Sequence, residues 1–127
     1  MEAPAEPVVV DLLALVRGSA ERGPLWTQQS ADLNVNLVAL DAGQRLAESV
    51  NAEVDVLLVG LAGEGVVTVN GQRLGLATGQ ALVIPKGARR VIDAAGGRFA
   101  YLTCHRRRAG LWPTNAPRPA PEPDSAG

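Results

Sequence analysis

Short apolar runs separated by turn residues leave this chain few folds to adopt. The runs consist of Val, Leu, Ile and Ala and recur at intervals of about 8 to 12 residues. Turn signals stand between them, such as Asn70-Gly71, which favours a tight hairpin because both central residues take positive φ. Because β-branched runs suit strands, the pattern predicts an all-β sandwich or barrel.

Seven of the runs are predicted to form strands. At residues 33–40 apolar and polar side chains alternate, as in a strand with one covered face. Residues 54–61 are apolar except for Asp55, so we expect both faces of that strand to be covered. Gly63-Glu64-Gly65 is expected to turn the chain into a return strand at residues 66–69. The other strands are predicted at residues 74–76, 81–84, 88–92 and 98–105.

The N-terminal part of the chain has a helical pattern instead. Asp11 is placed to cap a short helix, and Gly18 is placed to end it. Leu12, Leu13 and Val16 share an apolar face of this helix at helical spacing. From there through Pro24 the chain is expected to be a loop.

Length and composition predict one domain with two irregular ends. A chain of 127 residues has room for a single core. Five prolines after Trp112, with almost no aliphatic residues, predict a disordered and extended tail. The expected organisation is a flexible lead-in at residues 1–7, a barrel domain at residues 8–110 and a proline-rich tail at residues 111–127.

Charge and cysteine content exclude several classes of partner. A net charge of −1 gives no overall attraction to nucleic acid or to anionic membranes, and the arginines at 106–108 lack interleaved aromatic residues. The single cysteine, Cys104, cannot form an internal disulfide. No apolar run approaches the roughly 20 residues of a membrane span. We therefore expect a cytoplasmic protein with no membrane or nucleic-acid partner.

Glycines and a proline keep the spacing of a known pair of motifs. Gly43 and Gly63 fit the ends of G-x5-H-x-H-x3,4-E-x6-G, while Gly79, Pro85 and Gly87 fit G-x5-P-x-G-x2-H-x3-N. On these residues the chain resembles the small single-domain cupins over residues 33–106. The resemblance implies a jelly-roll barrel. The predicted fold class is therefore all-β, a small jelly-roll barrel with a short N-terminal helix and a disordered proline-rich C-terminal tail.

The four positions that hold metal ligands in cupins carry Ser49, Asn51, Val56 and Arg90 in this chain. The family places two histidines and a glutamate, and then a third histidine, around a divalent metal. Serine and asparagine are weak neutral ligands, and a guanidinium is a fixed cation. We therefore expect no metal and no other cofactor. The alternative is a metal site rebuilt from the nearby carboxylates Glu48, Glu53 and Asp55.

Arg90 points into the barrel if it follows the family geometry. A buried cation needs a partner. The partner is either Asp55 or Glu53 in an internal ion pair, or the carboxylate or phosphate of a small ligand held by the arginine fork. A shift of one residue in register would instead place Arg90 in water. The ligand-pocket candidates are Ser49, Asn51, Asp55 and Arg90, with Glu53, Tyr101 and His105 as secondary candidates.

The last predicted strand carries the only histidine. Tyr101, Thr103 and His105 share one face of it, and Cys104 lies on the other. A histidine at a strand end is expected to be solvated or hydrogen-bonded at the surface, and Cys104 is expected to be a small core residue. We assign no catalytic residue.

Two classes of function fit these observations. The first is a metal-free cupin that binds a small molecule in its barrel, with an anion among the candidates, or has a structural role only. The second is a metal-independent enzyme of the epimerase or isomerase type, for which Tyr101, His105 and the acids are the available acid–base groups. Loss of the family's ligands on an intact scaffold favours the first. The resemblance also implies a homodimer, unless the helix face of Leu12, Leu13 and Val16 packs on its own barrel.

Overall fold

A computed structural model describes residues 7–107 of the chain. One helix, α1 (Leu12–Gly18), precedes the strands, and no helix within these residues has the length and hydropathy needed to cross a membrane. The strands in chain order are β1 (Gly23–Gln29), β2 (Leu33–Leu40), β3 (Arg45–Val50), β4 (Val56–Ala62), β5 (Glu64–Val69), β6 (Gln72–Ala77), β7 (Ala81–Ile84), β8 (Arg89–Ala94) and β9 (Phe99–Arg106). Apart from Pro7, the expected lead-in and proline-rich tail, including Trp112, fall outside the described residues.

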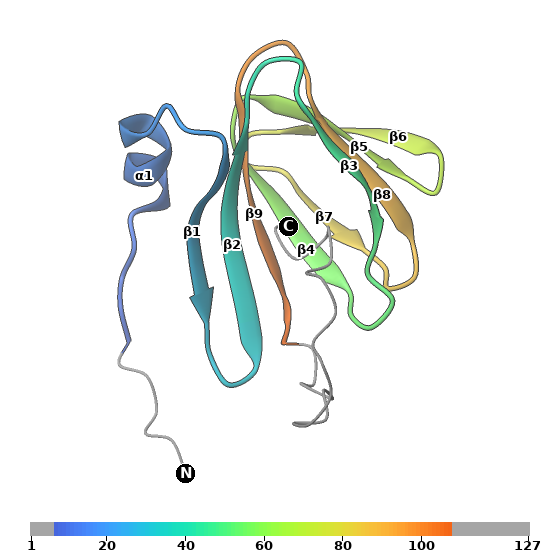
Figure 1. Cartoon of the computed structure of the whole chain (residues 1–127), viewed down its shortest axis with the longest axis horizontal. Coiled ribbons are helices and arrows are strands. Elements are labelled where there is room, and N and C mark those ends of the chain that lie inside the picture. The colour runs from blue at the N-terminus through green and yellow to red at the C-terminus, as the bar shows by residue number, and fades with distance from the viewer. Residues whose placement is uncertain (1–6, 108–127) are drawn as a thin grey trace, which may run out of the picture.

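The strands form two antiparallel sheets that face each other (Figure 1). The larger sheet has the order β1-β2-β9-β4-β7, and the smaller has the order β3-β8-β5-β6. α1 lies outside the barrel beside β1. The predicted all-β jelly-roll barrel with a short N-terminal helix is confirmed.

The glycines of the two motifs are turn residues in the structure. Gly43, Gly63, Gly79 and Gly87 have φ values of 76°, 71°, 85° and 84°. Side chains rarely adopt this left-handed region, so glycine is the residue that the turns require. The spacing of these four residues therefore records where the strands end.

Two strands, β1 and β3, are missing from the sequence prediction. The pairing of β1 shifts in register between Pro24 and Trp26, and the pairing of β3 shifts between Leu46 and Ser49. A shift of this kind breaks the period-two pattern by which a strand is recognised.

The connection after β4 also differs from the prediction. β5 is not the return strand of β4, because it pairs with β6 and β8 in the other sheet. Gly63 is a corner at which the chain passes from one sheet to the other.

The outer face of β4 is covered at one end only, where Leu61 packs with Val16 of α1, so the prediction of two covered faces holds for part of the strand. Val56 and Leu58 are buried inside the barrel, whereas Leu57 is 40% exposed on the outside. Its cross-strand partner Val83, on β7, is 57% exposed. The strand reads as continuously apolar because its outer positions are also aliphatic.

Aliphatic side chains from both sheets fill most of the barrel. The cluster contains two aromatic rings, Phe99 and Tyr101, whose centroids lie 5.2 Å apart. Its other buried members are Val38, Leu40, Val56, Leu58, Val67, Leu76, Ile84, Ala88, Ile92 and Ala94.

α1 packs on the outer face of the larger sheet. The Asp11 side chain accepts a hydrogen bond from the Ala14 amide at 3.0 Å and caps the helix as predicted. Val16 is buried against Leu37, Ala39 and Ala100, while Leu13 is exposed. The helix therefore uses its apolar face within its own chain.

Candidate ligand site in the barrel

β3 and β8 place Ser49 and Arg90 side by side. The two residues are cross-strand partners, so their side chains share the inner face of the smaller sheet. Their neighbours Val50 and Arg89 point outward and are exposed. Arg90 is only 1% exposed and Ser49 is buried. The Ser49 hydroxyl has no hydrogen-bond partner among the described residues.

Asn51 joins the turns of the two motifs. Its Oδ1 accepts hydrogen bonds from the amides of Glu53 and Val54 at 3.1 and 3.3 Å, and its carbonyl oxygen accepts from the Gly87 amide at 2.7 Å. The buried Nδ2 amino group makes no hydrogen bond to a described residue. The part of the Asn51 side chain that is left without a partner is therefore its amino group, which is a hydrogen-bond donor.

Tyr101 contributes a buried hydroxyl from the opposite sheet. Burial raises the pKa of its phenol, and the positive charge of Arg90 acts in the other direction. The Tyr101 hydroxyl lacks a hydrogen-bond partner within residues 7–107, as do the Ser49 hydroxyl and the Asn51 amino group. We refer to Ser49, Asn51, Arg90 and Tyr101 as the Arg90 cluster.

A second polar group lines the inner faces of β2 and β9. The Thr27 hydroxyl donates to Asn36 Oδ1 at 2.9 Å, and Asn36 Nδ2 donates to the Thr103 hydroxyl at 3.5 Å. Below them, Asn34 Nδ2 donates to His105 Nε2 at 3.4 Å. We refer to Asn34, Asn36, Thr103 and His105 as the Asn34–His105 layer.

His105 is a buried residue, and its expected surface position is wrong. It is 4% exposed because β2 pairs with β9 at this level and Asn34 lies opposite it. His105 Nδ1 lies 3.0 Å from the carbonyl oxygen of Arg106, which can only accept, so Nδ1 carries the proton.

The Arg90 cluster and the Asn34–His105 layer belong to the same end of the barrel. Residues 51–55 connect β3 to β4, and residues 85–88 connect β7 to β8. Both connections lie at the end where β9 finishes (Figure 1). β4 and β7 line the remaining wall with Val56, Leu58 and Ile84. The interior is thus polar on the β2–β9 and β3–β8 sides and apolar on the β4–β7 side.

The two acids proposed as partners for Arg90 lie outside this interior. Asp55 is exposed, and its Oδ1 accepts from the Lys86 amide at 2.8 Å. Glu53 is also exposed. The structure therefore pairs Ser49 with Arg90, places Tyr101 within the influence of the Arg90 charge, and leaves Asp55 and Glu53 at the surface.

Sequence reasoning missed Asn34, Asn36 and Thr103. The signal for the first two lies in residues 33–40, where both asparagines share a strand face with Val38 and Leu40. Two amides on the face that leads into the core indicate a polar interior as well as a strand end. Thr103 sits between Tyr101 and His105 on the inner face of β9.

The residues at the family's metal positions do not fit a divalent cation. Val56 has no donor atom, Asn51 has engaged its amide oxygen, and Arg90 places a fixed positive charge in the interior. Across residues 7–107, no three His, Cys, Asp or Glu side chains are grouped so that they could hold a metal ion. The donor set suits an anion better than a cation.

Solved structures share this architecture. Neither the protein-family models nor the curated proteins include a match to the sequence. A protein from Bacillus halodurans aligns with a TM-score of 0.69 and 20% identity, over 80% of this chain and 81% of that chain. A cupin superfamily protein from Desulfitobacterium hafniense aligns with a TM-score of 0.57 and 26% identity, over 62% and 71%. A sugar phosphate isomerase of the cupin superfamily from Silicibacter pomeroyi aligns with a TM-score of 0.57 and 18% identity, over 62% and 53%, which shows the fold alone.

Two facing antiparallel sheets with the motif glycines at their turns define a jelly-roll protein of the cupin class. The chain is a small cupin-domain protein.

Proposed function

We propose that this cupin-domain protein binds a small organic anion in its barrel without a metal. The observation that carries the proposal is the Arg90 cluster. It combines a buried cation with the Ser49 hydroxyl, the Asn51 amino group and the Tyr101 hydroxyl, each buried without a hydrogen bond to a described residue. Buried polar groups are normally hydrogen-bonded, so the Ser49, Asn51 and Tyr101 groups have hydrogen-bonding capacity left for a ligand.

The charge of the site selects the kind of partner. No Asp or Glu is buried among the described residues, and the described interior carries the Arg90 guanidinium together with amide and hydroxyl groups. A carboxylate or phosphate accepts hydrogen bonds from such groups, and a charge-assisted bond to arginine is about twice as strong as a neutral one. The Asn34–His105 layer adds amides and a hydroxyl that suit polar groups on the same ligand.

Thermal unfolding of wild type and Arg90→Ala, with a panel of organic acids and sugar phosphates, tests the proposal. At 100 times its Kd, a ligand specific for the folded state stabilises wild type by about 2.7 kcal/mol. We expect that stabilisation to disappear in Arg90→Ala, because the variant lacks the cation.

Arg89→Ala is the matched control for this experiment. Arg89 is the next residue on β8 but points outward, and its side chain is 66% exposed. It should keep the full response to the ligand. An Arg90→Ala protein that stays folded and responds as wild type does would show that the Arg90 cluster is not the anion site.

A metal-independent isomerase is the alternative function. Tyr101 and His105 share the inner face of β9, as an acid–base pair would require. The described interior supplies no carboxylate to complete such a pair. Turnover that is lost in Tyr101→Phe or His105→Ala would favour this alternative over binding alone.

The homodimer remains part of the proposal and rests on the resemblance to small cupins. α1 packs Leu12 and Val16 on its own barrel, so Leu13 is the residue of the predicted face that is left for a partner. Light scattering at micromolar concentration tests it, and a monomeric mass would exclude the dimer.

A further inference from the structure

The outer faces of the two sheets differ in chemistry. On the smaller sheet, Arg45 of β3 and Asp93 of β8 form an ion pair at 2.6 Å, and Arg89 lies 4.0 Å from Glu48. An antiparallel sheet normally carries such polar side chains on a face that meets water. Within the described strands, the two middle rows on the outer face of the larger sheet contain no charged side chain from β2 to β7. Only the smaller sheet therefore has an outer face typical of contact with water.

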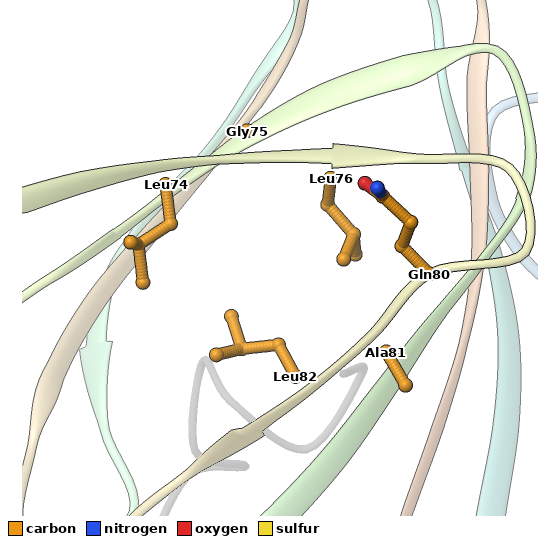
Figure 2. A pocket seen from close by; sticks show the side chains of 6 residues that line it. All are labelled: Leu74, Gly75, Leu76, Gln80, Ala81 and Leu82. Carbon is orange, nitrogen blue, oxygen red and sulfur yellow. The ribbon is translucent and has the colours of Figure 1, made fainter.

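Two rows of outward side chains cross the larger sheet from β2 to β7. The first row consists of the cross-strand partners Val35, Cys104, Leu57 and Val83. The second row consists of Leu37, Leu102, Val59 and Ala81. Figure 2 shows the alternation on β7, where Leu82 points toward Leu74 of β6 while Ala81 points the opposite way. All side chains of the two rows are apolar, so together they form a continuous apolar surface.

α1 covers one end of this surface and leaves the other end open. Val16 packs on Leu37 at the covered end, whereas Leu33, Leu57 and Val83 are exposed. A groove beside α1 extends the open part, because Leu13 lines it together with Val59 of β4. We refer to the open residues as the outer patch, which comprises Leu13, Leu33, Leu57, Val59, Val83 and Cys104.

The outer patch is large enough for a small interface between two proteins. Four strands about 4.8 Å apart, with three rows two residues apart, give roughly 400 Å² of sheet. Two such faces and the grooves beside α1 bury roughly 1,000 Å² together, which is the lower limit for a specific interface. The area therefore suits a dimer that dissociates on dilution.

We propose that the outer patch binds the outer patch of a second copy of this chain. An uncharged face offers a charged partner no counter-charge, whereas a second copy brings no like charge against it. A two-fold axis places the same apolar row on both chains, and the two sheets then pack about 10 Å apart. Arg106, which pairs with Leu33 at the end of β9, lies at the polar rim of this contact.

The inference names the surface of the homodimer proposed above and does not depend on the anion site. Sedimentation velocity of wild type, Leu57→Glu and Val83→Glu tests it. At micromolar concentration wild type should have the mass of two chains, and dilution should release single chains. Each variant places a carboxylate in the apolar contact and should raise the dissociation constant by roughly 100-fold or more.

Val50→Glu is the matched control for these variants. Val50 is exposed like Leu57 and Val83, but it lies on β3 in the smaller sheet. The Val50→Glu protein should therefore keep the mass of two chains at micromolar concentration. Circular dichroism establishes that each variant is folded, and the use of two patch variants makes the test independent of either one.

Cys104 gives a second readout because it is the only cysteine of the chain and is half-buried in the patch. The dimer covers its thiol, so labelling with excess maleimide should be slow at micromolar concentration and faster after dilution. Val83→Glu, two strands away from Cys104, should label fast at both concentrations. Val50→Glu should label as wild type does.

The outcomes separate the outer patch from the homodimer itself. A monomeric mass for wild type at micromolar concentration would overturn both. A dimer that persists in folded Leu57→Glu and Val83→Glu would overturn the outer patch as its surface and leave the homodimer standing. A dimer whose Cys104 is labelled as fast as in the diluted chain would do the same. The anion site is tested apart from this, by Arg90→Ala.

Discussion

Tyr101 is the only tyrosine of the chain, so its ionisation can be followed by the ultraviolet absorbance of tyrosinate without interference from another phenol. Burial raises its pKa in the folded state, whereas an unfolded tyrosine ionises near pH 10. We expect the folded protein to show no tyrosinate at that pH. A normal titration curve in the folded protein would contradict the buried position of the hydroxyl.

The same residue predicts how stability depends on pH. Above about pH 10 the unfolded state loses the tyrosine proton before the folded state does, so the unfolded state binds fewer protons. The free energy of unfolding should therefore fall with rising pH, by at most about 1.4 kcal/mol per pH unit. Below pH 10 the contribution is constant. Tyr101→Phe should remove this slope, as measured by urea unfolding at each pH.

At the scale of the element, the corner between β4 and β5 is the least tolerant position. A Cβ on Gly63 would collide with the carbonyl oxygen of Arg98, and its φ of 71° disfavours any side chain. Gly63→Ala should lower the free energy of unfolding by about 3 kcal/mol or more, combining the cost of the backbone conformation with that of overpacking.

Gly71 provides the matched comparison for Gly63. It has a similar φ of 84°, but a Cβ there meets nothing within 4 Å. Gly71→Ala should therefore show only the conformational cost of about 1 to 2 kcal/mol. Equal losses in the two variants, measured by urea unfolding, would mean that the corner can shift away from Arg98.

The sequence predicts the strands and turns of the barrel better than it predicts which polar side chains lie inside the barrel. Glycines at 43, 63, 79 and 87 mark turns because positive φ excludes most other residues, and their spacing also locates Ser49, Asn51 and Arg90. Asn34 and Asn36 give a weaker signal, because they share a strand face with Val38 and Leu40 but an amide on a strand face is more often solvated than buried. The burial of His105 depends on its contact with Asn34, 71 residues away, which no local pattern can show.

At the scale of the whole molecule, the protein should be free of a stoichiometric transition metal. Protein purified without a histidine tag should carry well under one Mn, Fe, Ni or Zn per chain by elemental mass spectrometry. The reason is that the described interior presents hydrogen-bond donors and the Arg90 guanidinium, which do not bind a metal cation. Added metals should barely change the melting temperature, which metal binding would raise. One bound metal per chain would indicate that the exposed carboxylates near residue 53 form a site of their own.

The position of β9 has a consequence for how the protein is made. This last strand lies between β2 and β4 in the larger sheet, and α1 packs against Ala100 within it. Arg98, just before β9, donates hydrogen bonds to the carbonyl oxygens of Val16 and Glu21, both at 2.8 Å. The first helix therefore gains its docking surface only after the last strand leaves the ribosome. The larger sheet is complete only when β9 is present, and a chain cut before Phe99 loses the centre of the sheet and not an edge.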